Sequence, residues 1–267
     1  MQDIMCIGAP FWMGELPEHE SAVNIIRRSG YAERMHANWC DIRPDYAAHF
    51  EPINAVNHAI AQTIKGHPNR FPVVFAGDCM CALGVVNGLD LHKLGCVWYD
   101  AHGDFNTAET SPSGFLGGMP LAMLVGRGDQ TYMQDLKCHP LKEQDIILTD
   151  ARNLDAAEAE SLAASSITIV DDVSEMLTVD LPKKPFYIHV DMDVVNCEEL
   201  PAMAYPEHGG PSLDDVAKTL KRVARDGEVA ALLLTVWDSS KNGKSDLHLN
   251  AALKLTQAVI DGMRHED

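Results

Sequence analysis

The feature that most constrains this chain is a series of short apolar runs, several of them apolar at every position, that end abruptly in polar or charged residues. Such runs are typical of strands covered on both faces, because a strand with one solvated face alternates apolar and polar side chains. The strand candidates are Ile4–Gly8, Pro72–Ala76, Cys96–Tyr99, Ile146–Thr149, Ile167–Val170, Phe186–Val190 and Val229–Val236. A sheet built from them needs a layer of helices on each side.

The segments between these runs supply the helices. The candidates are Pro52–Lys65, Met80–Leu89, Pro120–Val125, Leu154–Ala164, Ser212–Arg225 and Leu247–Arg264. Ser212, followed by Asp214 and Asp215 in the first turn, favours a helix start. The alternation of strands and helices predicts a three-layer α/β/α sandwich with a central, mostly parallel sheet. Because we find no low-complexity linker or internal repeat, we expect residues 1–267 to form a single domain.

The composition narrows the classes of partner. The chain has a formal charge of −18, from 39 acidic and 21 basic residues. An acidic surface repels phosphate backbones and anionic lipids, so we expect neither nucleic acid nor a membrane as a partner. The 7 cysteines form no Cys-X-X-Cys pair, which indicates a reducing compartment. Since the start has no signal-peptide pattern and no apolar run approaches about 20 residues, we expect a cytoplasmic protein.

Acidic side chains follow two of the strand candidates directly. Asp100, His102 and Asp104 follow one run, and Asp191 and Asp193 follow another. Alternate side chains of an extended chain share a face, and ligands of parallel sheets bind beyond the carboxyl ends of the strands. Four carboxylates in one pocket need compensating positive charge. Oxygen donors with one imidazole suit Mn²⁺, with Fe, Co or Zn as alternatives.

A structural role competes with this interpretation. Taken alone, an Asp-X-His-X-Asp segment serves a turn or a solvated loop as readily as a metal. The second Asp-X-Asp segment, after another buried strand, favours the metal site. His189, inside that strand candidate, is interpreted as a core histidine or one that contacts a ligand from outside, not as a ligand itself.

These motifs resemble those of the arginase/agmatinase (ureohydrolase) family, and the resemblance covers nearly the whole chain. The matching segments are Gly8–Phe11, Ala76–Met80, Asp100–Thr107, Thr110–Pro120, Arg152–Asp155 and Ile188–Asp193. In that family two Mn²⁺ ions share a bridging hydroxide, which attacks the guanidino carbon of the substrate.

The resemblance implies a role for each acidic residue of the two motifs. Asp100 and Asp191 would bridge the two ions, and His102 and Asp193 would bind one of them. Asp104 would bind the other ion and orient the hydroxide, so it is the predicted catalytic residue. Two metals lower the pKa of bound water and stabilise both charged oxygens.

The family also implies a small, amino-acid-like substrate. Asn106, Ser113 and Asp155 match positions that hold the carboxylate and amino group of such a substrate. Trimers or hexamers are common in the family, so we expect a homo-oligomer.

Several positions depart from the family pattern. Cys79 stands where the family has its first histidine ligand, and a thiolate there would favour Zn, Fe or Co over Mn; the alternative is a buried free cysteine beside a helix start. Gly117 replaces a proton-shuttling histidine. Thr235 or Val236 falls where the family has a carboxylate that pairs with the guanidino group, and Tyr205 narrows the same end.

These departures separate the functional hypotheses. The first is a metal-dependent hydrolase of linear amidine C–N bonds, with a guanidino, N-hydroxyguanidino or formimino amino acid as substrate and with arginine itself a poor one. The alternative is a non-catalytic, arginase-like subunit that binds metal or an amino acid within an oligomer. A deacetylase-like activity would need tandem histidines, and the sequence has none.

Overall fold

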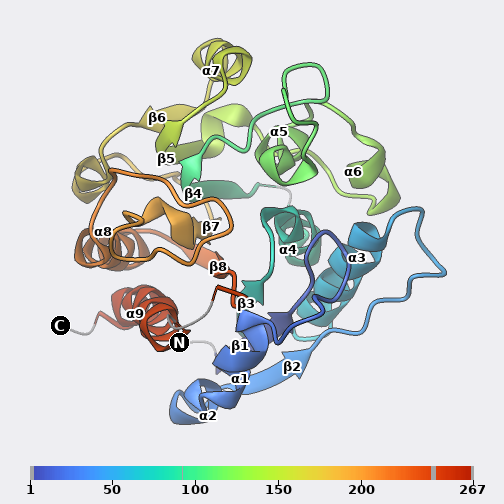
Figure 1. Ribbon diagram of the computed structural model, residues 1–267, viewed down its shortest axis with the longest axis vertical. Coiled ribbons are helices and arrows are strands. Elements are labelled where there is room, and N and C mark those ends of the chain that lie inside the picture. Colours follow the sequence, from blue (N-terminus) through green and yellow to red (C-terminus); the bar gives the residue numbers. More distant parts are fainter. Residues whose placement is uncertain (1–2, 92, 242–244, 266–267) are drawn as a thin grey trace.

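The computed structural model describes residues 3–91, 93–241 and 245–265. Its centre is one 8-stranded sheet with the strand order β2-β1-β3-β8-β7-β4-β5-β6 (Figure 1). Every pair of neighbouring strands is parallel. The strands are β1 (Asp3–Ala9), β2 (Asn38–Asp41), β3 (Arg70–Ala76), β4 (Gly95–His102), β5 (Ile146–Asn153), β6 (Thr168–Val170), β7 (Phe186–Asp191) and β8 (Val229–Thr235).

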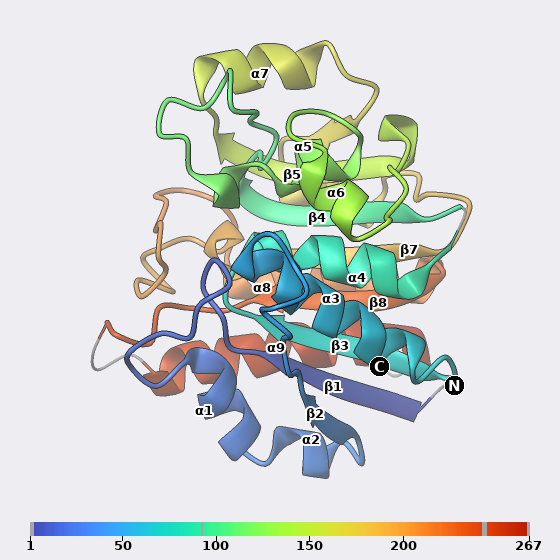
Figure 2. The same ribbon diagram turned by 90° about the vertical axis from the view of Figure 1, so that its right-hand side faces the viewer.

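Helices cover both faces of the sheet. They are α1 (Ala22–Arg28), α2 (Tyr31–Arg34), α3 (Pro52–Lys65), α4 (Ala82–Leu89), α5 (Pro120–Leu124), α6 (Thr131–Asp135), α7 (Ala156–Ala163), α8 (Leu213–Asp226) and α9 (Ser245–Arg264). In Figure 1, α8 and α9 lie on one side of the sheet and α3 and α4 on the other; Figure 2 shows α3 and α4 from the front. The predicted three-layer α/β/α sandwich is confirmed.

The two layers of helices enclose two apolar cores. Val97 and Tyr99 of β4 pack into the core beneath α8 and α9, whereas Cys96 and Trp98 pack into the core beneath α3 and α4. Successive side chains of a strand point to opposite faces, so a strand between two cores buries apolar side chains on both faces. This arrangement explains the uninterrupted apolar runs in the sequence.

Four elements have no counterpart among the sequence-based candidates: β2, α1, α2 and α6. The strand β2 lies at the edge of the sheet, and its residues are exposed or half-buried, so it lacks an apolar run. The helices α2 and α6 have 4 and 5 residues, too short for a helical period to be recognised. Helix α1 begins at an N-cap, Ser21, whose hydroxyl accepts a hydrogen bond from the backbone N–H of Asn24.

The register of the strands brings the ends of four of them together. Thr235 of β8 pairs with Ala76 of β3 and with Asp191 of β7. On the other side of β7, Val190 pairs with Tyr99 of β4, which directly precedes Asp100. The residues that follow β3, β8, β7 and β4 therefore meet at one edge. No helix in the described part of the chain is long and apolar enough to cross a membrane.

Candidate functional site

A cavity of about 360 Å³ opens at this carboxyl edge of the sheet. Its walls contain every site residue predicted from the sequence: Cys79, Asp100, His102, Asp104, Asn106, Ser113, Asp155, Asp191 and Asp193. Segments more than a hundred residues apart in the chain thus contribute to one concave site. The position agrees with the rule that ligands of open parallel sheets bind beyond the carboxyl ends of the strands.

The Asp100 carboxylate is held by its own strand. Its Oδ2 accepts a hydrogen bond from Nε1 of Trp98 at 3.1 Å, and its Oδ1 accepts one from the backbone N–H of His102 at 2.8 Å. Trp98 and Asp100 share a face of β4 because they are two residues apart. The carboxylate is 1% exposed, so its orientation is set by the protein and not by water.

Asp191 and Asp193 lie at the end of β7. The Asp191 Oδ1 accepts a hydrogen bond from the backbone N–H of Asp193 at 2.9 Å, which closes the turn after the strand. The Asp193 Oδ1 accepts a hydrogen bond from the backbone N–H of Ala101 at 3.2 Å. This second bond joins the ends of β7 and β4, and it fixes the two acidic motifs relative to each other.

The imidazole of His102 lies between two carboxylates. Its Nδ1 is 3.3 Å from Oδ1 of Asp100 and 3.1 Å from Oδ2 of Asp193. Although burial opposes a charge on the ring, the hydrogen bonds with both carboxylates raise the pKa of His102 to about 12. A proton on this ring therefore balances part of the negative charge whenever no metal ion does so.

Asp104 is the least satisfied of these acidic residues. Its backbone has a φ of 48°, in the left-handed region, and its buried Oδ2 has no hydrogen-bond partner in the described structure. Burial, together with the charges of Asp100, Asp191 and Asp193, raises the pKa of Asp104 well above its usual range. A strained residue with an unpaired carboxylate oxygen that faces other carboxylates is the arrangement that a bound cation would relieve. The donor set therefore fits divalent metal.

Cys79 begins a 3₁₀ turn (Cys79–Cys81) directly after β3. Its thiol donates to Oδ2 of Asp191 at 3.1 Å, and its Sγ is 3.8 Å from Oγ1 of Thr235. Burial and the neighbouring carboxylates raise the pKa of Cys79 well above its usual value, so the sulfur carries a proton unless a cation is bound. Cys81, two residues further on, packs into the apolar core.

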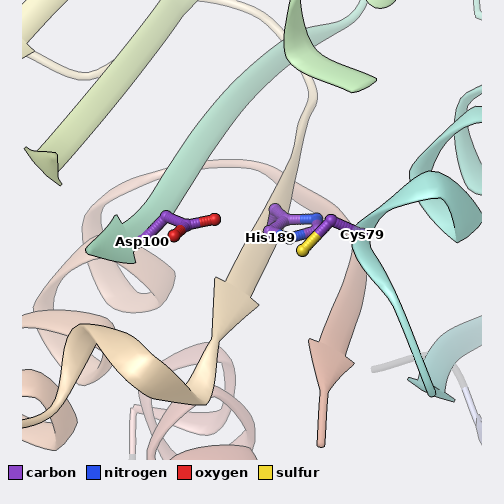
Figure 3. A group of neighbouring side chains, drawn as sticks. All are labelled: Cys79, Asp100 and His189. Atoms are coloured by element: carbon purple, nitrogen blue, oxygen red, sulfur yellow. The ribbon is translucent and has the colours of Figure 1, made fainter. Parts of the chain in front are cut away.

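Potential metal ligands form two groups, and within each group the ligand atoms all lie within 4.8 Å of one another. One group is Asp100, His102 and Asp193, and the other is Asp100, Cys79 and His189. Asp100 belongs to both. The second group includes His189, which the sequence had suggested was not a ligand (Figure 3). Burial lowers the pKa of His189 to about 3, so its ring is neutral and offers a lone pair.

The residues predicted to hold an amino-acid substrate lie in the segments that follow β4 and β5. Nδ2 of Asn106 donates to Oδ2 of Asp155 at 3.0 Å, and Oγ1 of Thr110 donates to Oδ1 of Asn106 at 2.9 Å. Ser113 is exposed in the loop above them, and its Oγ accepts a hydrogen bond from the backbone N–H of Phe115.

Glu158 holds the backbone beside Asn106 and at Asp155, and it was not singled out from the sequence. It is 3% exposed, and its Oε1 accepts a hydrogen bond from the backbone N–H of Phe105 at 2.8 Å. Its Oε2 accepts another from the backbone N–H of Asp155 and completes a capping box at the start of α7. The spacing of Asp155 and Glu158 is the usual signature of a capping box and could have revealed the residue.

Glu207 is a second residue that the sequence analysis missed. Its Oε1 lies 3.5 Å from Nε2 of His102, the ring nitrogen that faces away from the carboxylates, and accepts a hydrogen bond from Nδ2 of Asn153. Arg152 holds this loop by donating to the carbonyl oxygens of Asp193 and Glu207. A loop glutamate has no local sequence signal, so only the structure brings it to His102.

The outer rim of the cavity is aromatic. The rings of Trp12 and Phe115 stack with centroids 6.0 Å apart, and Tyr205 lies 5.5 Å from Phe115. Tyr205 is 49% exposed and therefore stands at the mouth. A Cβ added at Gly117 would overlap the Phe115 ring, so that ring fills the space where a side chain on residue 117 would lie.

The end of β8 carries no charge. Thr235 and Val236 both line the cavity, and neither is acidic. Thr235 is buried, and its hydroxyl donates to the carbonyl oxygen of Val190 at 3.5 Å. The register with β7 places Thr235 directly beside Asp191.

Comparisons with known proteins agree with this architecture. The family model of the arginase family matches residues 13–235. The chain is 33% identical to an arginase of Bacillus caldovelox over 196 residues, which are 68% of this chain and 65% of that protein. It is 35% identical to an arginase of Staphylococcus aureus (strain COL) over 137 residues, 51% of this chain and 44% of that protein. The chain thus matches less than two thirds of the length of these relatives.

Solved structures match over a longer range. A crystal structure of arginase from Bacillus subtilis superposes with a TM-score of 0.86 at 24% identity, covering 97% of this chain and 98% of the other. Formimidoylglutamase from Bacillus subtilis superposes with a TM-score of 0.76 at 18% identity, covering 100% and 88%. At these identities the likeness shows a shared fold.

Proposed function

Because this chain belongs to the arginase family, we propose that it is a hydrolase of linear amidine C–N bonds that depends on divalent metal ions. The observation that carries the proposal is the unpaired, buried Oδ2 of Asp104, which faces three further carboxylates in one cavity. A cluster of this kind destabilises the fold without a cation, so its presence argues for a metal-dependent reaction.

The residues fit two ions. Asp100, His102 and Asp193 would hold one, and Cys79 and Asp104 a second, with Asp100 and Asp191 shared between them. When bound, such ions neutralise the carboxylates and make water a nucleophile near neutral pH. Mn²⁺ suits the oxygen-rich side, while Cys79 favours Zn, Fe or Co.

Asp104 would act directly on the reacting water. Its Oδ2 is free to accept a hydrogen bond from that water and to orient it toward the substrate carbon. The buried position of this oxygen keeps bulk water from competing for the same bond. Asp104 is therefore our candidate catalytic residue.

Asn106 and Asp155 would bind the amino-acid end of the substrate, with Ser113 above them. Their hydrogen-bonded arrangement already orients an amide and a carboxylate toward the cavity. A carboxylate pairs with the substrate's ammonium group, and amide and hydroxyl groups donate to its carboxylate. A small amino-acid-like molecule is thus the proposed partner, and a homo-oligomer is the proposed assembly.

The reactive end of the substrate should be less basic than a guanidinium. A guanidinium is charged at all ordinary pH values and needs acidic partners, but Thr235 and Val236 supply none. Gly117 cannot donate a proton to the leaving nitrogen, and the Phe115 ring occupies the adjacent space. An N-hydroxyguanidino or formimino group depends less on both functions.

The proposal is tested by assaying arginine, agmatine, N-hydroxyarginine and formiminoglutamate side by side with Mn²⁺, Zn²⁺ and Co²⁺. We expect turnover of a candidate with a weakly basic leaving nitrogen and slow turnover of arginine, since loss of a general acid costs about 10²–10⁴ in rate. Arginine turnover near the ordinary median of about 10 s⁻¹ would contradict the assignment of the head group.

The second candidate function is a non-catalytic subunit that binds metal or an amino acid. The Phe115 ring beside Gly117 favours it, because a phenyl ring cannot act as an acid. If the protein holds its full complement of metal and turns over none of the four substrates, this candidate replaces the enzyme.

A further inference from the structure

His189 is the most unusual buried residue of the sheet. It lies in the middle of β7, is 0% exposed, and neither of its ring nitrogens has a hydrogen-bond partner in the described structure. A polar group that is buried without a partner costs free energy. An imidazole with two unpaired nitrogens therefore calls for an explanation beyond packing.

The surroundings of His189 fix the orientation of its ring. The register pairs it with Trp98 of β4, and the two rings stack with centroids 3.5 Å apart and planes 3° apart. The stack fixes the plane of the imidazole, so only its edge is free to make polar contacts. His189 and Asp191 share a face of β7 because they are two residues apart.

The edge of this ring approaches two potential ligands. Figure 3 shows the Asp100 carboxylate pointing from β4 toward His189, with the sulfur of Cys79 beside the ring. The ligand atoms of these three residues all lie within 4.8 Å of one another. A single ion could therefore contact all three after small side-chain movements.

We propose that His189 is a ligand of the ion at Cys79 and supplies, from β7, the imidazole that position 79 lacks. The inference rests on the proposed metal-dependent function and assigns the ligands of one of its two ions. A thiolate, an imidazole and a carboxylate together form a donor set typical of Zn²⁺, Co²⁺ or Fe²⁺.

The two sides of the centre then differ in chemistry. The group of Asp100, His102 and Asp193 is oxygen-rich with one imidazole and suits Mn²⁺, whereas the group with Cys79 and His189 is softer. Because Asp100 belongs to both groups, the two ions would be neighbours that share a carboxylate. The geometry thus points to a centre that takes two different metals.

The inference is tested with Co²⁺, whose absorption spectrum reports sulfur and nitrogen ligands. The key variant is His189→Phe, which keeps an aromatic ring against Trp98 and removes both nitrogens. Cys79→Ser removes the sulfur, and Cys81→Ser is the matched control, since Cys81 is also fully buried but packs into the apolar core. Metal-free full-length protein is titrated with Co²⁺, and thermal unfolding verifies that each variant folds.

We expect a sulfur-to-cobalt charge-transfer band in the wild type and in Cys81→Ser, and no band in Cys79→Ser. His189→Phe should keep the band but shift the ligand-field absorption. It should also weaken Co²⁺ binding at this site by at least about 10–100-fold, the loss seen when merely an outer partner of a ligand is removed.

Each other outcome is decisive. Unchanged affinity and an unchanged spectrum in His189→Phe would overturn the inference and leave the proposed function intact. A wild type that binds no divalent ion would overturn both.

If His189→Phe does not fold, X-ray absorption of the zinc-loaded His102→Ala variant replaces it, because that change removes the other imidazole of the site. One sulfur at about 2.3 Å and one imidazole nitrogen at about 2.0–2.1 Å from zinc are then expected. Absence of the nitrogen would contradict the inference.

Discussion

The two ends of the cavity are built differently. Around the acidic motifs and Asn106, side chains such as Asp100 and Asp155 are held by hydrogen bonds from backbone or neighbouring groups, and the unpaired Oδ2 of Asp104 is the exception. At the other end, ring contacts join the side chains of Trp12, Phe115 and Tyr205 at the rim. Directional bonds position charged groups, whereas apolar contacts fill space. The difference supports the proposal that the end with the acidic motifs binds metal and an amino acid while the other end admits a different head group.

The largest effect should come from a substitution at the end of the cavity that carries the two acidic motifs, which we call the acidic end. Asp191→Ala removes a carboxylate that contacts Cys79 and the backbone of Asp193. We expect metal content and turnover to fall to background, because a proposed ligand of both ions is lost. Added metal should no longer raise the melting temperature, although saturating metal at 100 times its Kd is worth about 2.7 kcal/mol in a protein that binds it.

Asp238→Ala is the control for that prediction. Asp238 is an acidic residue after β8 that caps a turn by accepting a hydrogen bond from the backbone N–H of Ser240, and it does not line the cavity. The control variant should bind metal as the wild type does. Retention of full metal content in Asp191→Ala would show that the acidic end is not a metal site.

A smaller effect is expected where the substrate's amino group would bind. Asp155→Ser keeps a good N-cap for α7 but removes the carboxylate, so stability should change little. Loss of a hydrogen bond to a charged group costs about 1.5–3 kcal/mol, which corresponds to about 10–100-fold in KM at unchanged kcat. Steady-state kinetics with the best substrate of the screen measure this split.

Asp172→Ser is the matched control for Asp155→Ser. Asp172 caps another helical turn with its side chain but is remote from the cavity. The two variants should share a melting temperature and differ in KM. An equal KM for both would remove Asp155 from the binding site.

The stability of the metal-free protein should depend on pH, because the acidic end contains buried carboxyl groups with raised pKa values. Burial, then repulsion from Asp100, raises the pKa of Asp191 to about 6. A carboxylate whose folded pKa is raised stabilises the fold below its unfolded pKa, and this stability is lost as the pH rises through the folded pKa. Stability of the metal-free protein should therefore fall from about pH 4 to above pH 6.

Bound metal should cancel this loss, because it replaces the protons. The gain in melting temperature on adding metal should be larger near pH 8 than near pH 5. For a chain somewhat shorter than this one, each 1 kcal/mol of added stability raises the melting temperature by about 2–4 °C. Thermal unfolding with a chelator or with saturating Zn²⁺ at both pH values measures the gain. An equal gain at both would mean that metal and protons do not compete.

The smallest effect is expected at the rim. Gly117→His inserts a side chain into the space of the Phe115 ring, and overpacking costs about 1–3 kcal/mol. We expect the lower end of that range, because Phe115 is half-buried and its ring can turn outward. In Gly117→His with Phe115→Ala the melting temperature should recover relative to the sum of the single changes. Strict additivity would show that the two positions do not share space.

Much of the fold was accessible from the sequence because burial on both faces leaves a local pattern. The runs that became β1, β3 and β4 are apolar throughout, and those that became β7 and β8 are interrupted only by His189 and Thr235, so their place in the interior of a sheet could be predicted. The edge strand β2 lacks such a pattern, because edge position depends on which strands lie beside it. Short elements such as α2 and α6 leave too few residues for a period to be detected.

Some contacts of the candidate site could likewise be predicted from the sequence, and others could not. Asp100 and His102 lie on alternate positions of β4, so their convergence follows from local geometry, whereas Asp104 lies beyond the end of the strand with a φ of 48°. Glu207 reaches His102 from a distant loop, and Phe115 reaches Gly117 by the folding of its own loop. Neither contact has a spacing in the sequence that could have predicted it.

By itself, the sequence determined which residues follow buried strands and which face of each strand they share, because those properties depend on the pleat of a single strand. Tertiary structure alone decided the neighbours. The sequence predicted that His189 is a core histidine or contacts a ligand from outside. The strand order β8-β7-β4 instead brings its ring against Trp98 and close to Asp100 and Cys79. Contacts across strands depend on the pairing of distant segments, and that pairing belongs to the whole sheet.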